Sequence, residues 1–369
     1  MLSLVKDESY RDSEKKINRI RWQEKDITQS RTIANIVEVE GSKIDQEIEK
    51  RSDKILEAYG FDRDGQPKGW DGSSRIEIET ELISEEIVQR TIEEYNKGKE
   101  EELQISASEL NETYENPWTC VNISIDEVGV KKQKENGRKP NCPRKEGKEY
   151  VRNSIIQVQK VGSGYILNGL GIVETIRRLI AFLLHNDLLR KGSLLFFVDG
   201  AKDLHSAIKS MFGWIPYRII LDWYHLVKKC EMQLSLGLKN KGIRNEILRK
   251  VRGYLWVGKI DHAVKVLGAV EEKDIKSQVA IDCLISYFER NRSYIPCYGL
   301  RKRLGLRISS NRGEKANDLA VADRQKHNGM SWSKKGSSAL ASVITLHQNN
   351  EQDNWIKKRQ ILFELKKAA

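Results

Sequence analysis

Two aspartates stand where apolar segments end, at positions where carboxylates can do chemistry. Asp126 closes the alternating apolar segment TCVNISID, and Asp199 follows the continuous apolar run SLLFFV. A carboxylate beside a buried strand costs free energy unless it is paired or bound to a metal. Carboxylate oxygens suit Mg²⁺ or Mn²⁺, and two such ions about 3.5–4 Å apart serve phosphodiester cleavage and transfer. The two aspartates therefore predict a divalent-metal site for phosphodiester chemistry.

Each carboxylate of this predicted site has either another possible structural role or a rival ligand. Asp126 could be an exposed acid at a strand end, with neighbouring Glu127 as a rival ligand. Asp199 could cap the helix expected after it. A third carboxylate should come from a helix expected to begin near residue 314. Glu314 opens that helix and Asp318 lies one turn later on the same face, so spacing alone leaves both open.

The elements that position these carboxylates are predicted from the apolar pattern. Strands are expected at 119–130, 151–161, 164–170, 193–199 and 217–222. Helices are expected at 172–192, 200–213, throughout 223–300, and at 314–327 and 334–347. Three strands followed by strand–helix alternation indicate an α/β fold with a mixed sheet, the order of the ribonuclease H-like fold. In that sheet the first and fourth strands are adjacent, so Asp126 and Asp199 could reach one metal.

Charge divides the chain into an acidic and a basic part. Residues 1–118 hold 18 Lys and Arg against 29 Asp and Glu, and the remainder holds 46 against 24. A large basic module suits a polyanion. We expect an acidic, mainly helical N-terminal region at 1–117 and a ribonuclease H-like catalytic domain in two pieces, 118–222 and 308–350. A basic helical insertion at 223–307 lies between the two pieces, and a polar tail follows at 351–369.

Composition excludes several classes of protein. The chain has no apolar run near the roughly 18 residues of a membrane helix, and its first residues lack the apolar region of a secretory signal. Its five cysteines form no CxxC pair, which argues against a zinc knuckle and a disulfide framework. A soluble intracellular protein without a membrane partner is expected.

Four stretches in order resemble the Mutator-like DDE transposases of bacterial insertion sequences: SIDEVGVK (124–131), FFVDGAKDLHSAI (196–208), ILDWYHLVKKC (220–230) and GEKANDLAVADRQKHNGMSWSKKGSSAL (313–340). The resemblance covers roughly residues 119–347. It implies that Asp126, Asp199 and Glu314 hold two Mg²⁺ or Mn²⁺ ions, and it selects Glu314 over Asp318.

The same resemblance implies supporting residues and partners. Asp222 and His225 would support the site, by a structural hydrogen bond or by orienting the active-site helix. The partners would be double-stranded DNA, as terminal inverted repeats and target, and further copies of the chain, in the bacterial cytoplasm at the nucleoid. The expected DNA contacts are Lys131, Lys132, Arg138, Lys139, Lys228, Lys229, Arg324, Lys326 and Trp332. The alternative for the basic residues is a solvated charge, and for Trp332 it is a place in the core.

The chain also departs from the family pattern. The family's GSG before the catalytic glutamate is Ser309-Ser310-Asn311 here, and no clear DNA-binding region precedes residue 118. Two other functions therefore stay open. One is a non-catalytic, DNA-binding remnant of a transposase. The other is a ribonuclease H-like nuclease that cuts without joining.

Overall fold

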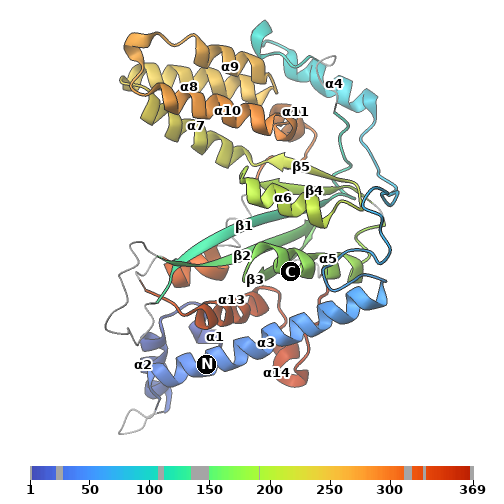
Figure 1. Ribbon diagram of the computed structural model, residues 1–369, viewed down its shortest axis with the longest axis vertical. Helices are drawn as coiled ribbons and strands as arrows, with labels where there is room; N and C mark the ends of the chain where they lie inside the picture. Colours follow the sequence, from blue (N-terminus) through green and yellow to red (C-terminus); the bar gives the residue numbers. More distant parts are fainter. Residues whose placement is uncertain are drawn as a thin grey trace.

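Five strands from the middle of the chain form a mixed sheet at the centre of the molecule (Figure 1). The computed structural model describes residues 2–21, 28–106, 112–133, 149–190, 192–310, 318–326 and 330–365. The strands are β1 (Val121–Lys131), β2 (Tyr150–Lys160), β3 (Ser163–Gly169), β4 (Leu194–Val198) and β5 (Tyr217–Leu221). All five lie where the apolar pattern predicts them, with ends that differ by one or two residues.

The order of the strands is β3-β2-β1-β4-β5. β1, β2 and β3 pair antiparallel, and β4 and β5 join β1 in parallel. β4 is buried along its whole length, as its unbroken apolar sequence predicts for a central strand covered on both faces. This α/β architecture with a mixed five-stranded sheet is consistent with the expected ribonuclease H-like fold.

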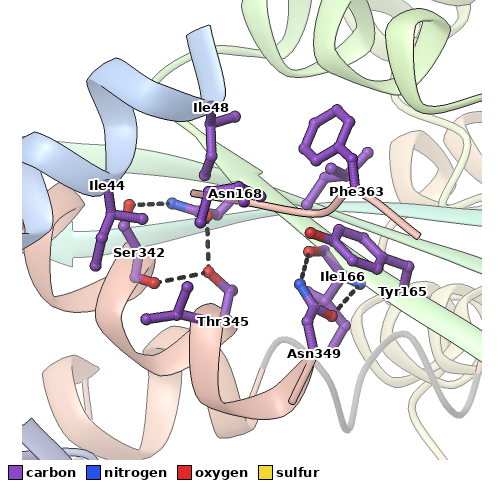
Figure 2. Close-up of a pocket in the computed structure, with 12 residues that line it drawn as sticks. Ile44, Ile48, Tyr165, Ile166, Asn168, Ser342, Thr345, Asn349 and Phe363 are labelled. Carbon is purple, nitrogen blue, oxygen red and sulfur yellow. Dashed lines mark hydrogen bonds between the residues drawn. The ribbon is translucent and has the colours of Figure 1, made fainter. Parts of the chain in front are cut away.

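Helices cover both faces of the sheet, and two residues of β3 show which helix lies on which face. Side chains alternate between faces along a strand, so Tyr165 and Asn168 point to opposite sides. The Tyr165 ring stacks on Phe182 of α5 (Ile172–His185), with centroids 4.5 Å apart. Asn168 bonds instead to Ser342 and Thr345 of α13 (Lys334–Gln348), at 2.8 and 2.9 Å (Figure 2).

The cavity beside Asn168 is too small for a ligand. It has a volume of about 10 Å³ and is lined by α3, β3 and α13 (Figure 2), which is room for a single water molecule at most. Its amide and hydroxyl groups bond to one another, so the network joins α13 to the sheet.

The first helices of the chain belong to the layer that supports the sheet. They are α1 (Leu2–Val5), α2 (Tyr10–Arg21) and α3 (Ser30–Ala58). α3 packs closely on α13 at Gly41, where an added Cβ would lie 2.2 Å from the main-chain oxygen of Ala339. Gly60 follows α3 with a φ of 76°, the left-handed conformation in which glycine commonly ends a helix. Apolar residues of α3 and of the sheet share one core.

The end of the chain is also part of this core, although a polar tail was expected at 351–369. After α14 (Gln352–Lys358), the chain buries Phe363 completely against Tyr165 and Phe182. The carboxylate of buried Glu351 accepts hydrogen bonds from the Tyr165 hydroxyl at 2.8 Å and from the main chain of residues 362 and 363. Within 351–365, the polar composition is therefore that of a surface around a buried anchor.

Helices between β5 and the last part of the chain build a second apolar core above the sheet (Figure 1). It continues onto the sheet through Leu195, Phe197 and Ile220. The helices are α7 (Trp223–Gly237), α8 (Lys241–Trp256), α9 (Ile260–Gly268), α10 (Gln278–Asn291) and α11 (Tyr298–Arg303), with short 3₁₀ turns η3 (Glu272–Asp274) and η4 (Arg292–Tyr294).

The acidic N-terminal region is divided between the core of the sheet and a third, smaller core that it shares with the helical part. α4 (Glu85–Asn96) and the 3₁₀ turn η1 (Glu101–Leu103) lie beside α11 and α8 (Figure 1), and Ile92 is buried with Leu300 of α11. Farther along, buried Arg301 forms an ion pair with buried Glu115. Helices α1, α2 and α3 therefore support the sheet, and α4, Tyr114 and Glu115 contact the helical part. Among the described residues, no helix is long and apolar enough to cross a membrane.

Candidate active site

Asp126 and Asp199 lie level on adjacent parallel strands. The register of β1 with β4 pairs Ser124 with Phe197, and continuing it by two residues sets Asp126 beside Asp199. Alternation puts both side chains on the face of Ser124 and Phe197. Asp126 also pairs across β2 with Ile155, and Ile155 pairs with Asn168. Asp126 therefore shares the face of the sheet that α13 covers.

Asp199 presents its carboxylate to solvent at the carboxyl end of β4. The residue is exposed, although the strand before it is fully buried. One oxygen, Oδ1, accepts a hydrogen bond from the Ala201 amide at 2.9 Å; Oδ2 accepts none from the described part of the chain. Ala201 is the N-cap of α6 (Lys202–Met211), so the Asp199 carboxylate holds the turn before the helix and does not cap its first turn.

Asp126 and Glu127 point to opposite faces, as successive strand residues do. Asp126 is half-buried, and its Oδ1 accepts from the Glu127 amide at 2.8 Å. The Glu127 carboxylate accepts instead from the Ser154 hydroxyl across β2, at 3.2 Å. Since Asp199 lies on the face of Asp126, this geometry favours Asp126 over Glu127 as its partner.

The third predicted carboxylate, Glu314, lies outside the described residues. The π-helix η5 (Asp318–Lys326) begins four residues later and packs against β1 and α13. Asp318 opens this helix. Within the described part of the chain, no three His, Cys, Asp or Glu side chains converge as a metal site. The two carboxylates on β1 and β4 are the hard oxygen donors that Mg²⁺ or Mn²⁺ prefers, so the donor set fits such an ion in chemistry.

Asp222 continues the row onto the third parallel strand, but its carboxylate has a structural role. The β4–β5 register, continued by one residue, sets Asp222 beside Asp199. Asp222 is completely buried, and its two oxygens accept from the main-chain amides of His225, at 3.0 Å, and Ser310. The first bond caps α7, and the second holds residue 310 at the end of β5. The expected Asp222–His225 contact is therefore to the histidine main chain.

A tyrosine of the helical part contacts the main chain of Asp199, and two basic side chains lie over its ring. The Tyr287 hydroxyl of α10 donates to the main-chain oxygen of Asp199 at 3.0 Å. Burial raises the pKa of Tyr287, and the negative charge of Asp199 raises it further, so the phenol stays a donor. Lys229 and Arg290 lie over the Tyr287 ring, 5.8 and 5.5 Å from its centroid, where the ring quadrupole attracts a cation.

His205 of α6 also faces this region. It is buried against Tyr294, with ring centroids 4.7 Å apart. Burial lowers its pKa, Lys209 lowers it as well, and Asp199 opposes the change. His205 is therefore neutral near pH 7, and its Nε2 has no hydrogen-bond partner among the described residues.

The residues expected to contact DNA fall into three groups. Arg138 and Lys139 lie outside the described residues. Lys131, Lys228 and Lys326 are exposed, Lys229 is half-buried beside Tyr287, and Lys132 pairs with Glu149 at 2.8 Å.

Burial argues against DNA contact by the last two candidates, Arg324 and Trp332. Arg324 is 3% exposed and donates to the main-chain oxygen of Val5 at 3.0 Å. Trp332 is 6% exposed, meets Tyr10 edge-on and donates to the main chain of Gln325. Arg324 joins η5 to α1, and Trp332 joins η5 to α2. The structure therefore favours the alternative interpretation of Trp332 as a core tryptophan.

Sequence reasoning did not single out Tyr287, His205 or Arg290. Tyr287 is one aromatic residue in a 14-residue amphipathic helix, and its spacing differs in no way from that of a core residue. Only the folding of α10 onto the end of β4 makes it a neighbour of Asp199.

Comparison with known proteins found little similarity. No protein-family model matches the chain, and no curated protein matches it. Among solved structures, the Drosophila P element transposase strand transfer complex aligns over 97% of this chain and 88% of that chain, with 10% identity and a TM-score of 0.23. A TM-score this low does not establish a common fold.

Proposed function

We propose that this chain is a metal-dependent DNA transposase of the Mutator-like DDE type, with Asp126, Asp199 and Glu314 as its catalytic carboxylates. The observation that carries the proposal is the position of Asp126 beside Asp199, level on adjacent parallel strands and on one face. In open α/β sheets, sites lie beyond the carboxyl ends of such strands. The resemblance of residues 124–131, 196–208, 220–230 and 313–340 to that family supports the third ligand.

The roles of the residues follow from their places. Asp126 and Asp199 would hold two Mg²⁺ or Mn²⁺ ions from the sheet, and Glu314 from the segment before η5. When bound, the ions activate the attacking oxygen and stabilise the leaving oxygen of the phosphodiester. Tyr287 would fix the Asp199 main chain, and Lys229 and Arg290 would attract the DNA backbone toward the carboxylates.

The partners follow from the reaction. Double-stranded DNA supplies the element ends and the target, and two ends must be held together for transposition. We therefore propose that the chain acts as a homo-oligomer on DNA.

The test is cleavage and joining of plasmid DNA that carries the sequences flanking the gene, with Mg²⁺ or Mn²⁺. Asp199→Asn and Asp126→Asn should each lower the rate by roughly a hundredfold or more, or about 2.7 kcal/mol of transition-state stabilisation. Each variant keeps the size of the side chain and removes a charged metal ligand. Circular dichroism of each variant checks that the fold is kept.

Two matched variants act as controls. Asp203→Asn changes an exposed carboxylate on α6, and Glu127→Gln changes the carboxylate on the opposite face of β1; both should cut at the wild-type rate. Equal cutting by wild type and Asp199→Asn would falsify the assignment. Cleavage without joined products would identify a nuclease, and DNA binding without cleavage under all conditions would identify a non-catalytic remnant.

A further inference from the structure

Two adjoining hollows form a groove on the helical part, on the side where α7, α8 and α4 meet. Their volumes are about 580 and 470 Å³, and they share Trp223 and Arg252 as lining residues. The larger is closed by residues 302–309 and the smaller by Tyr95 and Lys99. We call the two together the aromatic-basic groove.

Aromatic rings make up much of the wall of this groove. Two of them meet edge-on at its centre, since the ring centroids of Trp223 and Trp256 are 4.9 Å apart. Tyr224 is 45% exposed at the start of α7. The aromatic lining residues are Tyr95, Trp223, Tyr224 and Trp256. A set of partly exposed rings in one hollow indicates a surface built to contact a partner.

The charged lining residues are all basic. They are Lys99, Arg252, Lys302 and Arg307. Lys302 lies over the Trp256 ring, 5.8 Å from its centroid, and Lys99 over the Tyr95 ring at 5.4 Å. Within the described part of the chain no carboxylate lines either hollow, so the groove complements a polyanion.

The groove begins beside the candidate active site. Trp223 directly follows Asp222, which is level with Asp199, and its amide donates to the Ile308 oxygen at 3.1 Å. Ile308 and Ser309 line the groove, and the next residue, Ser310, donates to the Asp222 carboxylate. A DNA strand bound at the carboxylates and continuing toward β5 would therefore reach the groove.

We propose that the aromatic-basic groove binds unpaired DNA nucleotides, with bases on the rings and phosphates on the Lys and Arg side chains. Every base has a π-face, so alternating rings and cations bind a single strand with little sequence preference. The bases of a duplex are stacked on one another and cannot cover these rings. An acidic peptide would pair with the cations but supplies no flat rings for the aromatic wall. The inference depends on the proposed function only in taking DNA as the ligand.

The experiment measures binding of the full chain, in EDTA, to a labelled single strand of about 20 nucleotides and to its duplex. The wild-type chain should bind the single strand more tightly than the duplex. Tyr224→Ala removes an exposed ring and Arg252→Gln an exposed cation; each should weaken single-strand binding about fivefold or more, since one base stack contributes about 1–3 kcal/mol. Tyr224→Phe keeps the ring and should bind like wild type.

Matched controls separate the groove from general charge. Arg249→Gln changes another exposed arginine of α8 that does not line the groove, and Trp118→Ala removes a ring that is 70% exposed elsewhere. Both should bind like wild type. The proposal is overturned if Arg252→Gln and Arg249→Gln bind alike, if the losses are equal on the duplex, or if polyglutamate displaces the strand as well as unlabelled DNA does.

The two proposals fail in different ways. If Asp199→Asn cuts as wild type does while Tyr224→Ala and Arg252→Gln lose single-strand binding, the groove stands and the catalytic assignment fails. If Asp199→Asn alone stops cleavage while the groove variants bind normally, the catalytic assignment stands and the groove proposal fails.

Discussion

The Asp199 carboxylate is exposed directly after a strand that is fully buried, and it lies level with Asp126. Asp199 is predictable because a carboxylate after six apolar residues needs a reason to be there, and the structure exposes it at the strand end. The choice between Asp126 and Glu127 is not predictable from composition, because it depends on which face the pairing of β1 with β4 gives to each. Arg324 and Trp332 read as DNA contacts from their motif, but the approach of α2, from the other end of the chain, buries them.

Asp222 gives the residue-scale prediction. Asp222→Ala leaves the amides of His225 and Ser310 without their acceptor inside a buried site, so we expect it to lower the free energy of unfolding by about 2–4 kcal/mol. Asp222→Asn keeps one acceptor oxygen and should cost less. Urea denaturation measures both. Exposed Asp203→Ala is the control and should change stability by less than about 0.5 kcal/mol; an equally small effect of Asp222→Ala would contradict the structural role.

At the scale of elements, the strands are more predictable than the helices that cover them. Each strand carries its own apolar pattern, and parallel pairing follows from the helices between strands. The contacts of α3, α4 and the last residues with distant elements are not predictable in the same way. Their buried residues are sparse among charged ones, since each helix buries only one face.

The C-terminal anchor gives the element-scale prediction. Phe363→Ala should lower the free energy of unfolding by about 3–5 kcal/mol, because it removes a completely buried ring from the Tyr165–Phe182 cluster. Ile356→Ala, on α14 but 63% exposed, is the matched control and should have little effect. Chemical denaturation compares the two. Similar unfolding midpoints for the two variants would mean that the side chains of segment 359–365 do not contribute to the apolar core.

For the whole molecule, composition predicts two modules of opposite charge, and the structure divides the acidic one between the core of the sheet and a small core beside the helical part. The difference in net charge between the two parts of the chain does not predict which elements each part contacts. α4 lies against the basic helical part, where opposite charges attract, and α3 lies under the sheet. There Arg178 pairs with Asp45 and Glu49, at 3.4 Å each.

Three of the six histidines give the chain a predicted pH dependence. Burial lowers the pKa of His185, His205 and His347 below the ordinary 6.5. As pH falls through 6.5, the unfolded chain binds protons that the folded chain does not, so stability present above that pH is lost on acidification. The urea concentration at the unfolding midpoint should therefore decrease as the pH is lowered from about 7.5 to about 5.5. This range lies above the pH at which carboxylates titrate.

Substitution of the three histidines identifies the source of this dependence. The triple His→Gln variant should show a flatter profile over the same pH range, whatever its absolute stability. A wild-type midpoint that is constant from pH 7.5 to 5.5, or an identical slope in the triple variant, would contradict the interpretation.

The shared core of the sheet and both chain ends has a consequence for biosynthesis. Val5, near the first residue, and Phe363, near the last, are both completely buried in the core that includes β1 and β4. Synthesis releases the N-terminal part first, so α3 and the sheet leave the ribosome well before α13 and Phe363 exist to cover them. The supporting layer is complete only once residue 363 has left the ribosome. A stop codon between positions 352 and 363 would therefore yield a chain that has every candidate catalytic residue but lacks the Phe363 ring in its core.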